Sequence, residues 1–122
     1  MKIQTSHILL TNLKFYAYHG VDPQETKVGN TYIINLRINT NYLKAAKTDN
    51  VNDTISYADI FQSIKKEMEI PSKLLEHVIY RISARLFKDY PSIEDLDITL
   101  NKINPPMGAD IETAGVHLYC TR

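Results

Sequence analysis

Apolar and polar residues alternate along four segments of the chain, and this period of two predicts four β-strands. The predicted strands cover residues 6–18, 31–43, 96–101 and 114–121. In the first of them the apolar parity switches between Leu10 and Leu13. One extra residue in a strand turns every later side chain to the opposite face, so we expect a β-bulge near residues 11–12.

Two further segments carry apolar residues every three or four positions, which is typical of amphipathic α-helices. The first helix is expected over residues 57–69, and the apolar stripe of the second runs over residues 75–86. Ser56 with Asp59 predicts a capping-box start for the first helix. Ser72 is the predicted N-cap of the second helix, because its hydroxyl can accept an N–H of the first turn.

The order strand, strand, helix, helix, strand, strand (ββααββ) indicates an α+β fold in one domain of residues 1–122. We expect an antiparallel four-stranded sheet with both helices on its apolar face. The opposite, polar face carries Asn35, Arg37, Asn39, Asp97, Thr99, Asn101, His117 and Tyr119. Such a sheet has two free edges. Copies of the chain could pair at these edges into a ring, or the polar face of a monomer could simply meet water.

Composition excludes several classes of function. The 14 basic and 14 acidic residues give a net charge of zero, and no basic patch or tail indicates a nucleic-acid partner. The single cysteine, Cys120, excludes an intrachain disulfide and is typical of a reducing compartment. The apolar run at residues 8–10 is too short for a signal-peptide core or a membrane span. We therefore expect a soluble, cytoplasmic protein with no membrane partner.

The positions of histidine and glycine argue against a metal or phosphate site. His7, His77 and His117 show neither His-x-His nor His-x-x-x-His spacing. The four glycines are scattered, which excludes a Gly-rich phosphate loop, and the chain has no nucleophile elbow. No metal and no cofactor are therefore expected.

Lys102 is the most informative charged residue. It shares the parity of Leu96 and Leu100, the apolar residues of the third strand. A charged lysine on that face is costly to bury without a partner, and a lysine in such a place suits acid–base chemistry. From parity alone, the strand could instead end before Lys102 and leave its side chain in water.

Three other side chains each have an ordinary and a chemical interpretation. Glu76, in the first turn of the second helix, complements the helix dipole, and its carboxylate could equally accept two adjacent N–H groups of a ligand. Tyr57 begins the first helix, and Glu25 lies in the loop of residues 21–29. A tyrosine at a helix start usually has its hydroxyl in water, and a glutamate in a loop is usually solvated. His19, before Gly20, is interpreted as a structural residue that holds the turn.

Several short motifs occur in a set order along the chain. They are Phe15-Tyr16-Ala17-Tyr18-His19-Gly20, Glu25, Gly29, residues 49–57, Leu74-Leu75-Glu76-His77 and residues 101–106. Their order and spacing resemble those of the dihydroneopterin aldolase family, the pterin-cleaving enzymes of folate biosynthesis. The resemblance runs from about Ile8 to Arg122. Ala17 stands where the family often has glycine, and Ile103 rather than proline follows Lys102, but neither change removes a catalytic group.

The resemblance implies a quaternary structure. Members of this family have the tunnelling fold, in which four subunits pair edge to edge into a tetrameric β-barrel and two rings stack as a homo-octamer. The polar sheet face would then line a wet central channel. Active sites would lie at subunit interfaces, so the partners expected are further copies of this chain and a small pterin substrate.

The resemblance also implies a role for each candidate residue. Lys102 matches the family's catalytic lysine. The tyrosine matching Tyr57 reaches into the site of the neighbouring subunit, where it contacts the substrate and its hydroxyl helps to move a proton. The glutamate matching Glu76 anchors the pterin ring together with backbone near Leu75. The position of Glu25 contacts the substrate side chain.

The implied reaction is retro-aldol cleavage of 7,8-dihydroneopterin into 6-hydroxymethyl-7,8-dihydropterin and glycolaldehyde, without a metal, a cofactor or a Schiff base. Three alternatives stay open. The same groups could epimerise the 2′ carbon of dihydroneopterin or of its triphosphate. The ring could bind a pterin without catalysis. Lys102 could instead form a Schiff base with the substrate.

Overall fold

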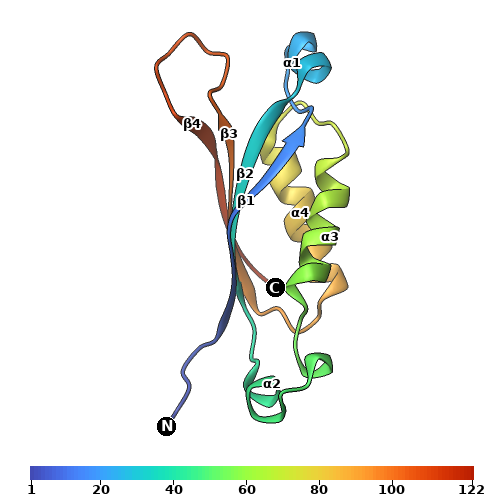
Figure 1. The fold of residues 1–122 in the computed structure, drawn as a ribbon, viewed down its shortest axis with the longest axis vertical. Helices are drawn as coiled ribbons and strands as arrows, with labels where there is room; N and C mark the ends of the chain where they lie inside the picture. The colour runs from blue at the N-terminus through green and yellow to red at the C-terminus, as the bar shows by residue number, and fades with distance from the viewer.

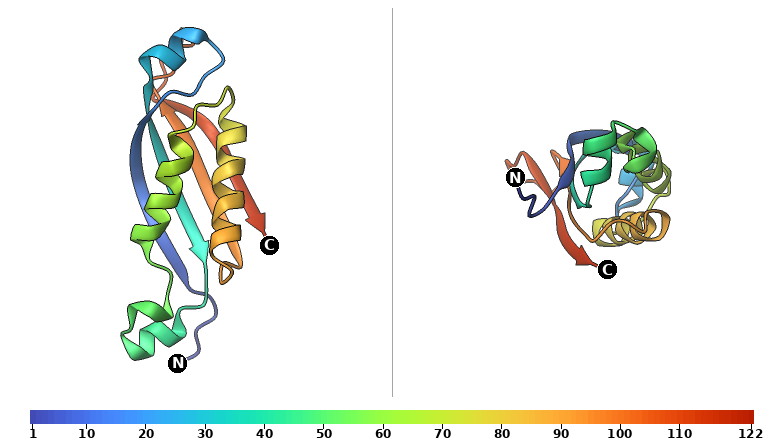
Figure 2. Two further views of the ribbon diagram at one scale, coloured as in Figure 1. Left: turned by 90° about the vertical axis from the view of Figure 1, so that its right-hand side faces the viewer. Right: turned by 90° about the horizontal axis from the view of Figure 1, so that it is seen from below.

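The computed structural model describes residues 1–122. Four antiparallel strands form one sheet in the order β1-β2-β3-β4 (Figure 1). The two long helices, α3 and α4, cover one face of this sheet (Figure 2), which confirms the predicted α+β arrangement. The elements are β1 (His7–Ala17), α1 (Pro23–Val28), β2 (Asn30–Asn39), α2 (Leu43–Thr48), a 3-10 turn (Val51–Asp53), α3 (Tyr57–Met68), α4 (Leu75–Asp89), β3 (Asp95–Ile103) and β4 (Thr113–Thr121).

The core lies between the sheet and the two long helices. β3 alternates buried and half-buried residues along its length, and Leu96, Ile98 and Leu100 are fully buried. Ile60 of α3 and Ile82 of α4 are fully buried as well. Burying one side chain of this kind contributes about 1.5–3 kcal/mol. The period-two and period-3.6 stripes therefore meet in one apolar layer, as the sequence predicts.

The predicted β-bulge is present in β1. The pairing with β2 shifts register between Leu10 and Leu13. Asn12 adopts a positive φ of 55°, and its N–H donates to Asn35 Oδ1 at 2.8 Å. Asparagine tolerates the left-handed conformation better than most residues, so the bulge has a local cause in the sequence. The bulge brings Leu13, Phe15 and Ala17 back onto the apolar face.

The second strand is shorter than predicted, because it ends at Asn39 and not at Leu43. Asn39 pairs with His7 at the start of β1 and with Asp95 at the start of β3. Both neighbouring ladders stop at this point, so the chain beyond Asn39 has no strand to pair with. Leu43 instead begins the short helix α2. Apolar alternation alone does not report where a partner strand ends.

Of the two predicted caps, Ser56 is the N-cap residue of α3 without a capping box, and Ser72 does not cap α4. The Ser56 side chain makes no cap hydrogen bond at α3. At α4 the N-cap is Leu74, not Ser72. The Ser72 backbone N–H instead donates to His19, and its hydroxyl accepts from Arg81. Ser72 is thus taken up by tertiary contacts, and the loop before α4 runs on for two residues beyond it.

The sheet face opposite the helices is polar and includes a cluster of charged groups. Asp97 lies 2.9 Å from His117 Nε2 and 3.9 Å from an Arg37 guanidinium nitrogen. β1 and β4 each form hydrogen-bonded ladders on one side only. No group of three or more His, Cys, Asp and Glu side chains is placed to hold a metal ion. None of the helices combines the length and apolar character needed to cross a membrane.

Candidate active site

Lys102 and Glu25 form an ion pair at one end of the sheet. β3 continues to Ile103, so Lys102 lies inside the strand, in register with Tyr32 of β2. Its Nζ is 2.8 Å from Glu25 Oε1, and the two side chains are 11% and 21% exposed. The alternative of a lysine extending into water is therefore wrong. A largely desolvated ion pair of this kind needs good geometry to persist, and each partner is costly to leave alone.

Glu25 is held by a helix that the sequence did not predict. Residues Pro23–Val28, expected to be loop, form α1. Asp22 caps this helix by accepting from the Gln24 N–H, and Glu25 Oε2 accepts from the Asp22 N–H at 3.3 Å. This is a capping box, whose signature is an N-cap residue followed three positions later by glutamate. The Glu25 carboxylate thus closes the start of α1 and pairs with Lys102 at the same time.

Gly20 makes room for the Glu25 side chain. A Cβ built at Gly20 would lie 2.6 Å from the Glu25 Cβ, which is closer than real side chains approach. Glu25 and His19 line a cavity of about 470 Å³ together with residues that flank α1 and follow β3. Asn30 and Asn104 add polar groups to its wall. The ion pair therefore lies beside a hollow of the size that small ligands occupy.

His19 is a buried histidine held at both ends. It is 1% exposed, and its Nδ1 accepts the Ser72 N–H at 3.1 Å. Its carbonyl accepts from the Tyr32 hydroxyl at 2.9 Å. Burial, reinforced by the charges of Arg81 and Lys102, lowers the pKa of His19 from 6.5 to about 4. These contacts agree with the interpretation of His19 as a residue that holds the turn, in its neutral form.

We expect His19 to make the fold sensitive to acid. Between about pH 6.5 and 4 the unfolded chain binds a proton on this imidazole that the folded chain does not. Stability therefore falls as the pH drops through this window and is constant above it with respect to this group. The full shift corresponds to about 3 kcal/mol. Urea unfolding of the wild type and of His19→Asn across this range measures the difference, and parallel curves for the two proteins would contradict the assignment.

Leu75 and Glu76 begin α4 at the same end of the molecule as α1 and the end of β3 (Figure 1). Glu76 is exposed and Leu75 is half-buried. The loop before them is held by Arg81, a residue that sequence reasoning missed. Its guanidinium donates to the carbonyls of Glu67 and Ile70, to the Glu67 carboxylate and to the Ser72 hydroxyl. An arginine on a half-polar helix face carries no sequence signal for this role.

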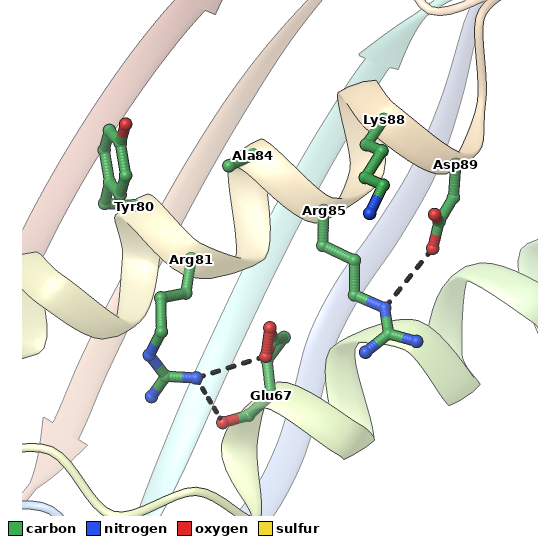
Figure 3. Close-up of a pocket in the computed structure, with 7 residues that line it drawn as sticks. All are labelled: Glu67, Tyr80, Arg81, Ala84, Arg85, Lys88 and Asp89. Carbon is green, nitrogen blue, oxygen red and sulfur yellow. Dashed lines mark hydrogen bonds and ion pairs between the residues drawn. The ribbon is translucent and has the colours of Figure 1, made fainter.

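Figure 3 shows Arg81 and Glu67 at one end of a second hollow, between α3 and α4. Its volume is also about 470 Å³. Arg85 pairs there with Asp89 at 3.3 Å, one helical turn along α4. The charged groups of this hollow largely pair with one another or with backbone, and none of the sequence-predicted site residues lies in it. We therefore place the candidate site at the first cavity, beside the Glu25–Lys102 ion pair.

Tyr57 lies apart from the other candidates. It is the first residue of α3 and is 70% exposed. α3 starts at the end of the molecule that carries α2, whereas α1, the start of α4 and the end of β3 lie at the other end (Figures 1 and 2). The fold thus brings Glu25 and Lys102 into contact and sets Leu75 and Glu76 at the same end. It does not bring Tyr57 of the same chain to them.

Comparisons with known proteins agree on one family. The family model for dihydroneopterin aldolase matches residues 8–119. The chain is 32% identical over 117 residues to the Arabidopsis thaliana protein named "Probable dihydroneopterin aldolase 3", and the match covers 94% of this chain and 73% of that protein. The solved structure of E. coli dihydroneopterin aldolase in complex with neopterin is 23% identical, with a TM-score of 0.86 over 94% of this chain and 98% of that one.

A third relative extends the same pattern of fold. A Burkholderia dihydroneopterin aldolase, solved bound to guanine, is 17% identical with a TM-score of 0.77, over 97% of this chain and 92% of that one. At these identities the two solved structures establish a common fold and no more. The family model, by contrast, spans nearly the whole sequence. The chain belongs to the dihydroneopterin aldolase family.

Proposed function

We propose that this protein cleaves 7,8-dihydroneopterin by a retro-aldol reaction, releasing glycolaldehyde and 6-hydroxymethyl-7,8-dihydropterin. The observation that carries the proposal is the ion pair between Lys102 and Glu25 beside a cavity, at the end of the fold where Glu76 begins α4. A largely buried lysine next to a carboxylate suits proton transfer. Membership of the family supplies the substrate class.

The chemistry asks the protein for orientation and proton transfer. The 2′-hydroxyl loses its proton, the C1′–C2′ bond breaks, and the bonding electrons pass into the conjugated C6=N5 imine to give an enamine. Protonation at C1′ then leaves the hydroxymethyl group. Many aldolases use a lysine Schiff base or a metal as the electron sink, whereas this substrate contains its own. We therefore propose a reaction without Schiff base, metal or cofactor.

Lys102 and Glu25 act on the substrate side chain in this proposal. Lys102 moves the proton, through water, between the 2′-hydroxyl and N5. Glu25 positions the side-chain hydroxyls while it holds Lys102. Because Glu25 is bonded at both oxygens, it is oriented before any substrate binds. Preorganised groups of this kind lose little entropy in the reaction.

Glu76 holds the ring in the proposal, with the backbone near Leu75. A pterin presents an exocyclic amine beside a ring N–H, and one carboxylate accepts both in a charge-assisted pair. Guanine has the same pair of donors on its pyrimidine ring. That one relative was solved with neopterin and another with guanine supports a site that reads this edge.

The site is completed by a neighbouring copy of the chain. We propose that Tyr57 of a second subunit protonates and deprotonates the reacting carbon, in a homo-oligomer built as a tetrameric β-barrel and stacked into an octamer. Three features support this: the unpaired outer edges of β1 and β4, the 70% exposure of Tyr57, and its separation from Lys102 within one chain. The free thiol of Cys120 agrees with action in the cytoplasm.

Replacing Glu76 with glutamine is expected to weaken pterin binding by about ten- to a hundredfold. The amide turns one of the two acceptors into a donor that faces the donors of the ring. Titration with neopterin, followed by its fluorescence, measures the effect. Asp59→Asn is the matched control, because it removes a carboxylate from the first turn of α3. Equal affinities for Glu76→Gln and the wild type would contradict the anchoring role.

Incubation of metal-stripped protein with 7,8-dihydroneopterin tests the proposed function. Chromatography should detect 6-hydroxymethyl-7,8-dihydropterin and glycolaldehyde in equal amounts. A new stereoisomer of the substrate without cleavage would instead establish the 2′-epimerase. Borohydride trapping of a covalent adduct on Lys102 would contradict the mechanism without a Schiff base. If an assembled oligomer forms neither the cleavage products nor the stereoisomer, the proposal is overturned.

A further inference from the structure

His19 lies between the two halves of the candidate site. On one side its Nδ1 accepts the Ser72 N–H, and the neighbouring Gly20 N–H donates to the Ser72 carbonyl at 3.0 Å. These two bonds grip Ser72 from both sides. Ser72 comes four residues before Glu76, so the grip acts on the segment of residues 72–76 that leads into the start of α4.

On its other side His19 contacts Tyr32, the residue that pairs with Lys102 in the sheet. Its ring packs edge-on against the Tyr32 ring, with centroids 5.2 Å apart. Tyr32 pairs with Lys102 in the sheet, and Lys102 Nζ lies 5.7 Å from the centre of the same ring. The Tyr32 hydroxyl donates back to the His19 carbonyl. One residue thus spans from the proton-transfer pair to the ring-binding segment.

The tautomer of His19 follows from its partners. An Nδ1 that accepts an N–H carries no proton, so the neutral ring has its proton on Nε2. That nitrogen is buried and bonds to no other side chain or backbone atom. The Nδ1 acceptor is therefore the working contact of the ring. Two substitutions distinguish this acceptor from the rest of the ring. Asparagine places an oxygen near the Nδ1 position and keeps the acceptor, whereas glutamine places its amide near Nε2 and removes it.

We propose that His19 is a positioning residue for the reaction, which sets the ring-binding segment of residues 72–76 at the correct distance from the Lys102–Glu25 pair. The inference rests on the proposed function, since it assigns the two halves of the site to ring and side chain. Catalysis requires the substrate to meet both halves at once, and a shift of about 1 Å between such groups can lower a rate a hundredfold. The bond from Ser72 to His19 fixes this distance.

The test compares His19→Gln with His19→Asn. Both variants remove the imidazole and its packing on Tyr32, so both should lose thermal stability to a similar extent. Only His19→Asn keeps an acceptor for the Ser72 N–H. Three quantities are measured for each variant: kcat for 7,8-dihydroneopterin, the Kd for neopterin, and hydrogen exchange of the backbone segment 70–76 by mass spectrometry.

In His19→Gln we expect kcat to fall about 10- to 100-fold while the neopterin Kd changes little, since Glu76 still binds the ring. Exchange of segment 70–76 should be faster in this variant. His19→Asn should keep kcat within a few-fold of the wild type and keep the segment protected. Equal losses of kcat in the two variants, or no loss in either, would overturn the inference.

The outcomes separate this inference from the proposed function. If the wild-type oligomer is inactive, the proposed function is refuted. If the wild type cleaves 7,8-dihydroneopterin, the proposed function stands regardless of the results for the two variants. If the wild type is inactive, the exchange comparison still decides whether His19 Nδ1 holds the segment. Identical exchange of segment 70–76 in both variants would then refute the contact on which the inference depends.

Discussion

Replacing Lys102 with methionine is expected to lower kcat by about 10²–10⁴-fold, the contribution usual for a positioned acid–base group. Methionine keeps most of the length and volume of the lysine stem, so the pairing of β3 with β2 at Tyr32 should persist. Ring binding should survive because Glu76 lies on α4 and does not contact Lys102. Stopped-flow measurement of product formation, with a separate titration of neopterin, distinguishes the two effects.

Lys88→Met is the matched control, because Lys88 is an exposed lysine on α4. It should leave both kcat and the neopterin Kd unchanged. Glu25→Gln should also lower kcat, since it removes the charge that holds Lys102 Nζ. Full turnover by Lys102→Met would show that the proton moves by another route and would sink the role of the ion pair.

Two inactive variants are expected to restore activity when their subunits are mixed. Within one folded subunit, Tyr57 and Lys102 lie toward opposite ends of the molecule, so each proposed site takes these residues from different subunits. A chain with Tyr57→Phe still supplies Lys102, and a chain with Lys102→Met still supplies Tyr57. Unfolding the two together and refolding them in equal amounts should leave about one site in four with both residues intact.

The measurement is the specific activity of the mixed oligomer against that of each variant refolded alone. A chain carrying both substitutions, refolded with Tyr57→Phe, provides the control, since no site in that mixture can hold both residues. Mass spectrometry of the intact oligomer verifies that subunits have mixed. Mixed oligomers that stay as inactive as their parents would show that Tyr57 does not complete the site of a neighbour.

Much of the fold was predictable because local patterns report which face of an element is buried. Alternation located all four strands, and the parity switch between Leu10 and Leu13 located the bulge. The two helical stripes located α3 and α4. The same reasoning placed Lys102 on the apolar parity, where it lies. The short helices α1 and α2 were harder to predict, because they bury no residues and so have no apolar stripe.

For the candidate site, the sequence offered a set of candidate residues but not their arrangement. The motifs named Glu25, Tyr57, Leu75, Glu76 and Lys102, but no pattern showed which of them would meet. The capping box of α1, Asp22 with Glu25, was legible in the sequence as an aspartate followed three residues later by a glutamate. It would have located this helix, although not the second use of the Glu25 carboxylate.

The sequence by itself determined the four strands and the two long helices, the faces that they bury and the residue types available for chemistry, since these depend on neighbours a few positions apart. Tertiary structure decided the pairings. Lys102 meets Glu25 across 77 residues, and Ser72 meets His19 across 53, which takes it from its predicted place as a helix cap. Such contacts form when separate elements pack together, and the periodicity of apolar residues along the sequence carries no information about them. For the same reason the separation of Tyr57 from Lys102 became visible only in three dimensions.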